Sequence, residues 1–411
     1  MPRYDKFRAT EVVLSGDNPV IVGYVTDFIS PEDNRLFTMR EYSLSGASAT
    51  REWYYNYTAG EYDDDGYTIT SYKTEDTPPE ERFIGAGFHQ YDLEGVPQNP
   101  EPAGLTVLLD EDGDTVCAPH TFRETWYNAC CRDVVYIGGL NAHEEVYSSC
   151  SWYFDSDTVM RGFIEIAYED TEISLIEDSG IDGSWEKILF DSEEDLLVLG
   201  GFQDPDQDGF GDLRVGCIDL TSTPYEITEQ DDWGDDDYVF LEGPLLQVDD
   251  GLYICISNGS YEDESEDSHW GIGVTFWNWD SHLSPSLILK DSDIYTTDDD
   301  FDGYKNVSAI GIAFDDSVDP ENLVVILEAV TDDNSEDYYI LVAKIPVDVV
   351  NMTLGSLTIS SELEVIPESG YTVSASDFYF SSINPVEGVG CGAADYSANS
   401  QKFWIFRIED D

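Results

Sequence analysis

Short runs rich in Val, Ile, Tyr, Phe and Trp alternate along this chain with turns of Gly, Asp, Asn, Ser and Pro. Almost no stretch shows apolar residues at the spacing of three and four positions that an amphipathic helix requires. Short apolar runs separated by turn residues are typical of β-strands. The sequence therefore predicts an all-β protein, whose core must form between sheets.

The expected strands repeat in groups of four. The clearest group covers 186–230, with strands expected at 187–191, 196–202, 213–220 and 225–229. Further groups follow at 244–290 and 307–365. Successive four-stranded meanders whose starts lie about 55 to 65 residues apart are the pattern of β-propeller blades.

Extending this repeat to both ends predicts one β-propeller domain over 1–411. Seven four-stranded blades are expected at 19–73, 82–122, 128–177, 186–230, 244–290, 307–365 and 377–409. The last group supplies only three strands, and the N-terminal strand at 6–14 is predicted to close the ring as its fourth, which would hide an open edge. Two alternatives remain: six blades with 82–122 as an insertion, or two packed β-sandwiches.

Charge is the unusual feature of the composition. The chain has 87 Asp and Glu against 18 Lys and Arg, a formal net charge of −69, yet 41% of its residues are hydrophobic, enough for a packed core. Self-repulsion of this size destabilises a compact state at ordinary ionic strength, whereas molar salt shortens the screening length to about 3 Å. These features predict a protein of a halophile, and the scarcity of basic residues argues against nucleic-acid binding.

The N-terminal segment has no apolar region of a signal peptide, and no run is long enough for a transmembrane helix. We therefore expect a protein that is neither exported by such a signal nor inserted into a membrane. Seven Cys are present without a C-x-x-C pair. Cys117, Cys130, Cys131 and Cys150 lie close enough in sequence to allow disulfides.

A candidate metal loop lies at 200–216, GGFQDPDQDGFGDLRVG. Asp204, Asp206 and Asp208 occupy alternate positions, a glycine follows, and Asp212 closes the pattern D-x-D-x-D-G-x-x-D. Alternate carboxylates converging on a hard cation, with glycine in the sharp turn, are the chemistry of a calcium loop. The twelfth position is Val215 in an expected strand instead of a Glu on a helix, so an EF-hand is not predicted.

This context resembles the FG-GAP repeats of integrin α-type β-propellers, where a strand runs through the acidic loop into L-x-V-G. The resemblance implies that Ca²⁺, with Mg²⁺ or Na⁺ as alternatives, is chelated by two sets of residues. The first set is Asp204, Asp206, Asp208, the carbonyl of Phe210 and Asp212. The second is Asp298, Asp300, Asp302, the carbonyl of Tyr304 and Asn306, in a copy that lacks L-x-V-G. The alternative is that a chain so rich in Asp contains such spacings by chance.

Enzyme motifs are scarce. None of the five His has metalloprotease spacing, and there is no nucleophile elbow, phosphate-binding loop or dinucleotide fingerprint. A glycosidase needs two carboxyls about 5 to 10 Å apart. With 87 acidic residues the sequence nominates no pair. The aromatic runs at 53–57, 152–154 and 277–279 are interpreted as core packing in preference to a glycan-binding surface.

The function predicted is that of a non-enzymatic structural or adhesion protein of a halophilic archaeal virus. It would be a calcium-stiffened tail-tip, fibre or capsid-surface component, assembled in the host cytoplasm. Its partners would be other virion proteins and a host-surface glycan or glycoprotein. The alternatives are a propeller-type polysaccharide hydrolase or lyase, and a scaffold in the haloarchaeal cytoplasm. An enzyme would show clustered acidic or His side chains with raised carboxyl pKa values.

Overall fold

The computed structural model describes most of the chain, and every regular element in the described part is a β-strand. The described residues are 6–26, 35–45, 48–57, 63–74, 77–91, 101–122, 127–140, 143–156, 159–169, 171–177, 183–203, 212–229, 238–241, 243–262, 268–280, 286–297, 299–332, 337–365, 372–383, 386–395 and 401–408. No helix in this part is long and apolar enough to cross a membrane.

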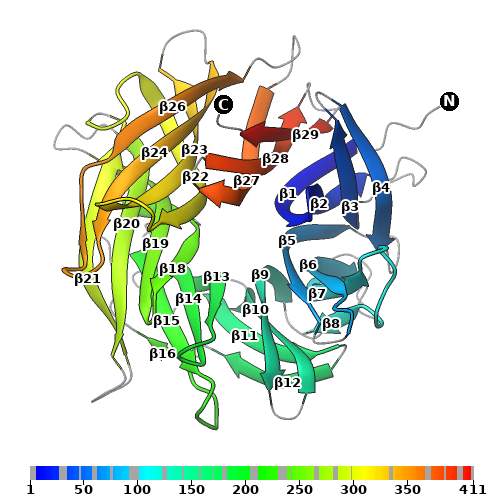
Figure 1. Ribbon diagram of the computed structural model, residues 1–411. Helices are drawn as coiled ribbons and strands as arrows, with labels where there is room; N and C mark the ends of the chain where they lie inside the picture. The colour runs from blue at the N-terminus through cyan, green and yellow to red at the C-terminus, as the bar shows by residue number, and fades with distance from the viewer. Residues whose placement is uncertain are drawn as a thin grey trace. The chain divides into compact units, whose positions relative to one another are not determined.

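The strands form seven separate antiparallel sheets, numbered here in chain order (Figure 1). Most follow one another as meanders, and the fold is a seven-bladed β-propeller, as the sequence predicts. Contacts divide the chain into two compact units, the first made of 1–180, 370–379 and 389–406, the second of 181–369, 380–388 and 407–411.

The first unit contains three complete sheets and most of the last one. Sheet 1 is β1 (Lys6–Ser15), β2 (Asn18–Thr26), β3 (Arg35–Ser45) and β4 (Ser48–Tyr57); sheet 2 is β5 (Asp64–Lys73), β6 (Glu81–Tyr91), β7 (Glu101–Asp110) and β8 (His120–Phe122); sheet 3 is β9 (Tyr127–Leu140), β10 (His143–Ser156), β11 (Val159–Tyr168) and β12 (Thr171–Glu177); sheet 7 is β27 (Thr372–Ile383), β28 (Val386–Asp395) and β29 (Gln401–Ile408).

The second unit contains the other three sheets. Sheet 4 is β13 (Gly183–Asp191), β14 (Leu196–Gln203), β15 (Asp212–Asp219) and β16 (Thr228–Glu229); sheet 5 is β17 (Tyr238–Leu241), β18 (Leu245–Asp249), β19 (Leu252–Glu262), β20 (Ser268–Asp280) and β21 (Ser286–Thr296); sheet 6 is β22 (Tyr304–Asp315), β23 (Glu321–Thr331), β24 (Tyr338–Asp348), β25 (Thr353–Leu354) and β26 (Thr358–Val365).

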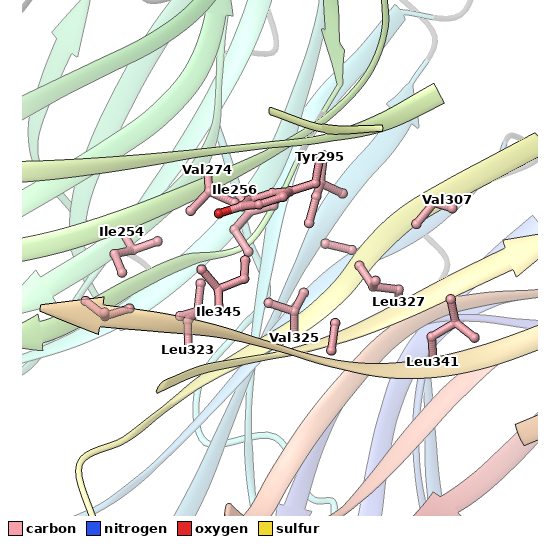
Figure 2. Packing of buried hydrophobic residues seen from close by; sticks show 14 of the residues in the cluster. Ile254, Ile256, Val274, Tyr295, Val307, Leu323, Val325, Leu327, Leu341 and Ile345 are labelled. Atoms are coloured by element: carbon pink, nitrogen blue, oxygen red, sulfur yellow. The ribbon is translucent and has the colours of Figure 1, made fainter. Parts of the chain in front are cut away.

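Within each unit the core lies between the faces of successive sheets. Phe37 of sheet 1 packs in one cluster with Phe83 and Leu105 of sheet 2. A large cluster in the second unit joins sheets 5 and 6, where Ile254 and Tyr295 meet side chains of β22 to β24 (Figure 2). Burial of such apolar surface contributes about 25 cal/mol per Å², so these interfaces supply the main stabilisation.

Two of the three aromatic runs have described side chains, and most of these side chains pack in the cores. Trp277 is fully buried, and Trp279 packs against the same cluster. Trp53 packs against the core between sheets 1 and 2, while Tyr54 points to solvent. The packing interpretation is therefore correct for these strands. The side chains of 152–154 lie outside the described set.

The expected closure by the N-terminal strand is wrong. β1 pairs with β2 from Ser15↔Asn18 to Lys6↔Thr26, so it is the first strand of sheet 1 and no part of sheet 7. The reason is local: Gly16 adopts φ +58°, and the tight turn there makes a hairpin whose short loop costs little entropy.

This hairpin shifts the first two predicted blades by one strand. The segment expected to end the blade at 19–73 is β5, which opens sheet 2. The first and last sheets still meet within the first unit, face against face. Val12 and Ile21 share a cluster with Val389, and the N–H of Val12 donates to Asp377 Oδ2 at 3.0 Å.

All seven Cys are free thiols, so the disulfides that the sequence allowed do not form. Burial raises the pKa of the Cys217 and Cys255 thiols to about 12, with a further contribution from Asp219 at Cys217. Both thiols are protonated at neutral pH and act as small core residues.

Candidate functional site

Most of the first predicted metal set lies outside the described residues. Asp204, Asp206, Asp208 and Phe210 belong to the undescribed segment 204–211. Asp212 is described as the first residue of β15, opposite Gln203 of β14. The loop therefore joins two paired strands, and its calcium site stays a prediction.

The second set is described except for Asp298. Asp300 is half-buried, and its Oδ2 accepts a hydrogen bond from the N–H of Thr296 at 3.1 Å. Asp302 and Asn306 are exposed, and Tyr304 begins β22. Throughout the described segments no group of three or more His, Cys, Asp or Glu is placed to hold a metal ion. This loop too keeps its calcium site only as a prediction.

A different cluster of ionisable groups lies where β5 begins. We call it the Asp65 cluster and define it as Arg35, Asp63, Asp64, Asp65 and His89. Arg35 is the first residue of β3 in sheet 1, whereas the other four belong to sheet 2 or directly precede it. All five lie within the first unit.

Arg35 and Asp65 form the central ion pair of this cluster. Arg35 Nη1 lies 2.7 Å from Asp65 Oδ2, and the Asp65 side chain is only 3% exposed, against 43% for Arg35. The main-chain N–H of Arg35 also donates to Asp63 Oδ1 at 2.8 Å. The second oxygen of Asp65, Oδ1, is buried and has no hydrogen-bond partner among the described residues. A buried acceptor left without a partner costs free energy, and a water or ligand group that reached this atom would offset that cost.

Asp64 and His89 form a second, deeper pair. They are direct cross-strand neighbours on β5 and β6, and His89 Nδ1 lies 2.6 Å from Asp64 Oδ1. The Asp64 side chain is 1% exposed, so the pair is shielded from solvent. The ring of Tyr57 meets the His89 ring edge-on, with centroids 5.7 Å apart. These contacts hold the imidazole in one orientation.

Two glycines allow the backbone to approach this closely. A Cβ at Gly87 would lie 1.9 Å from the carbonyl oxygen of Asp65, and one at Gly66 would lie 2.6 Å from Val22 Cγ2. Any larger residue at these positions would push β5 away from β6 or β2. The absence of side chains at Gly66 and Gly87 therefore allows Asp64 and Asp65 to lie where they do.

Burial dominates the electrostatics of Asp65. Desolvation raises its pKa from the ordinary 3.8 to about 6, although Arg35 acts in the opposite direction. Because Arg35 binds Oδ2, a proton taken up near pH 6 has Oδ1 as its open position. Asp65 thus changes between hydrogen-bond acceptor and donor near neutral pH.

Aromatic side chains and a second arginine lie beside these charges. The guanidinium of Arg35 sits over the Tyr24 ring at 4.8 Å, and that of Arg132 sits over the Tyr67 ring at 5.1 Å. Burial raises the pKa of the Tyr67 hydroxyl far above neutrality, with a further contribution from Asp65. The surroundings therefore combine the neutral hydroxyl of Tyr67, two aromatic faces and two of the chain's 18 basic residues.

A second buried acid–base pair joins sheets 2 and 3. His120 Nε2 lies 2.9 Å from Glu165 Oε1, and the Glu165 side chain is fully buried. Ser148 Oγ donates to the carbonyl of Glu165 at 2.9 Å. His120 is 12% exposed and Glu165 fully buried, whereas Arg35 of the Asp65 cluster is 43% exposed, so the Asp65 cluster is the stronger candidate for a ligand site.

Sequence reasoning named none of the residues of the Asp65 cluster. The run Asp63-Asp64-Asp65 at the start of a strand was a usable signal, but similar acidic runs recur throughout the chain. Arg35 and His89 are separated from it by 30 and 25 residues. Only pairing of β5 with β6 and packing against sheet 1 bring them together.

No protein-family model matches this chain, and no curated protein matches it. Among solved structures, a neuraminidase-like protein of a bat isolate from Guatemala is 9% identical, with 79% of this chain and 84% of that chain covered and a TM-score of 0.40. One of a flat-faced bat isolate from Peru is 9% identical, with 86% of each chain covered and a TM-score of 0.36. A tail fibre of a Staphylococcus aureus phage is 9% identical, with 86% of this chain and 93% of that chain covered and a TM-score of 0.19. Likenesses this weak carry no argument about function.

Proposed function

We propose that this protein is a carbohydrate-binding β-propeller and that the Asp65 cluster is its binding site. The observation that carries the proposal is the buried Oδ1 of Asp65, which has no hydrogen-bond partner in the described structure. A sugar hydroxyl both donates and accepts, so it fits Asp65 in either protonation state. The partly exposed Arg35 offers donors to neighbouring oxygens. Aromatic faces beside a few convergent polar groups are the usual lining of such sites.

The arrangement of the two carboxyls favours binding over hydrolysis. Asp64 and Asp65 are consecutive on β5, where successive side chains point to opposite faces of the sheet. The pairing of β5 with β6 is consistent with opposite faces, because Asp64 lies opposite His89 and Asp65 lies opposite Phe88. Hydrolysis of a glycosidic bond needs two carboxyls that flank the same bond. This argument supports an adhesion role.

A polysaccharide hydrolase is the second candidate. It is favoured by the raised pKa of Asp65, about 6, which suits a general acid at neutral pH. A buried carboxyl paired with an arginine also matches part of the feature expected of an enzyme, whereas His89 pairs with Asp64 instead. Release of reducing sugar from the bound polysaccharide, lost in Asp65→Asn, would select this candidate.

We further propose that the protein serves on the particle of a halophilic archaeal virus, as a tail-tip, fibre or capsid-surface component. The support is the net charge of −69 in a chain with a buried apolar core, which suits a solvent of molar salt. Calcium in the loops at 204–212 and 298–306 would stiffen the sheets that carry them. Mass spectrometry of purified halovirus particles against host cytosol tests this setting. Finding the chain only in cytosol would contradict it.

Binding is tested on a haloarchaeal surface glycoprotein, before and after chemical deglycosylation, in molar salt. The wild-type chain should bind the glycosylated form alone, and Arg35→Ala and Asp65→Ala should each weaken binding at least about tenfold, which corresponds to one lost charged hydrogen bond. Asp316→Asn, at an exposed position, is the control for net charge. Equal binding of both variants and wild type would refute the site.

A further inference from the structure

Sheet 7 has three strands in the part of the chain that the structure describes. Among the described strands β29 has one neighbour, β28, whereas each of the other six sheets has at least four strands (Figure 1). Because β1 belongs to sheet 1, the chain's own N-terminal strand does not supply the fourth. The described edge of β29 therefore offers backbone N–H and C=O groups over eight residues.

Third strands elsewhere in this protein are deeply buried. β3 and β15 each contain six consecutive buried residues, with patterns iiBBBBBBiie and iBBBBBBi, where B is buried, i half-buried and e exposed. Outer strands look different: β4 and β26 are mostly exposed, with patterns eeeeeieiei and eieeeeei. In sheet 1 the exposed outer strand β4 shields the buried third strand β3, and in sheet 6 β26 lies beside β24 in the same way.

The sequence of β29 is as apolar as that of the buried third strands, but its side chains are less buried than theirs. Its central run, Phe403-Trp404-Ile405-Phe406, is as apolar as any third strand, yet only Phe406 is buried. Side chains on both faces of β29 nevertheless make contacts. Phe403 and Ile405 pack against the core of sheet 1, while Trp404 stacks on Phe406 and donates from Nε1 to the carbonyl of Ser374 at 3.0 Å. What has no strand beside it, among the described residues, is the outer edge of β29.

The charge pattern indicates what kind of strand fits there. β29 carries Lys402 and Arg407 and no acidic residue, in a chain with 87 acidic and only 18 basic side chains. The outer strands β12 and β26, in contrast, each carry two glutamates. A strand with acidic side chains is therefore complementary to β29, because opposite charges on neighbouring strands attract.

We propose that the edge of β29 is a docking site for an extended, acidic strand of a partner protein, which completes sheet 7 as its fourth strand. Backbone hydrogen bonds along the edge would supply affinity, and the half-exposed Phe403, Trp404 and Ile405 would supply apolar surface. An uncovered apolar edge is otherwise a liability for aggregation, which gives the chain a physical reason to keep a partner. This inference is independent of the carbohydrate site.

The test uses hydrogen exchange on the full chain in molar salt, with light scattering to fix its oligomeric state. The probe is an acidic outer strand of known sequence, 358–365 (TISSELEV), appended after Asp411 through a flexible Gly/Ser linker. The matched control carries proline at two alternate positions of the appended segment, which removes its strand-forming N–H groups.

The unmodified chain should be monomeric, with β29 amides exchanging faster than those of β24. The appended strand should slow the β29 amides about tenfold, equivalent to about 1.4 kcal/mol, and the proline control should not. Three results would overturn the proposal: β29 already as protected as β24 in the monomer, equal effects of the two fusions, or a dimer in which a second copy protects β29.

Discussion

Replacing Asp65 with Asn removes a buried carboxyl while keeping an oxygen that can accept from Arg35 Nη1. In the folded wild type, burial raises the Asp65 pKa from 3.8 to about 6. The folded state therefore holds a proton between about pH 4 and 6 that the unfolded chain has released. Linkage then requires wild-type stability to fall as pH rises through this window.

The size of the effect follows from the shift in pKa. At 1.36 kcal/mol per unit, a rise from 3.8 to about 6 amounts to about 3 kcal/mol. The side chain is only 3% exposed, so solvent screening removes little of this. Asn does not titrate, so the unfolding free energy of Asp65→Asn minus that of wild type should increase by about 3 kcal/mol from pH 4 to pH 8.

The assay is denaturant or thermal unfolding of both proteins across this pH range in molar salt, with a probe of the first unit. Asp316→Asn, an exposed position, controls for the loss of one charge. The difference for Asp65→Asn should rise between pH 4 and 6 and then level off. A flat difference, or one that falls with pH, would show that Arg35 outweighs burial and would refute the reasoning.

Gly87→Ala should lower the melting temperature by several degrees, because its Cβ would lie 1.9 Å from a backbone oxygen, whereas Gly200→Ala meets only ordinary contacts and should cost less. Asp206→Ala and Asp208→Ala should each remove the first predicted ion and lower melting in calcium buffer, and a chelator should reproduce this in wild type alone; unchanged melting would refute that site. Trp277→Ala should cost about 3 to 5 kcal/mol of stability, measured by unfolding, and leave carbohydrate binding of the folded protein intact.

The strand pattern was readable because each sheet is formed from one local stretch of the chain. Most neighbouring strands are consecutive in the chain, so period-two runs and turn residues carry most of the topology. What failed was the assignment of the first strand. A turn at Gly16 decided between two partners that the pattern of 6–14 satisfied equally well, since each sheet core accepts an apolar strand. The loss of one strand from sheet 7 followed from that choice.

The Asp65 cluster was out of reach of sequence reasoning for a different reason. With 87 acidic residues, composition marks none of them. Asp65 differs from its neighbours because Arg35 of another sheet covers it and because Gly66 and Gly87 leave room for the close approach of β5. Burial, and with it the raised pKa of Asp65, is a property of that packing.

The sequence by itself determined the all-β class, the repeat of small sheets and the acidic surface, because these depend on local periodicity and on composition. The tertiary structure alone decided which strand pairs at the N-terminus, which sheet keeps an open edge, and which carboxyl is buried beside an arginine. These outcomes depend on contacts between residues that lie far apart in the chain. The local sequence pattern does not show which residues distant in the chain will pack together and become buried.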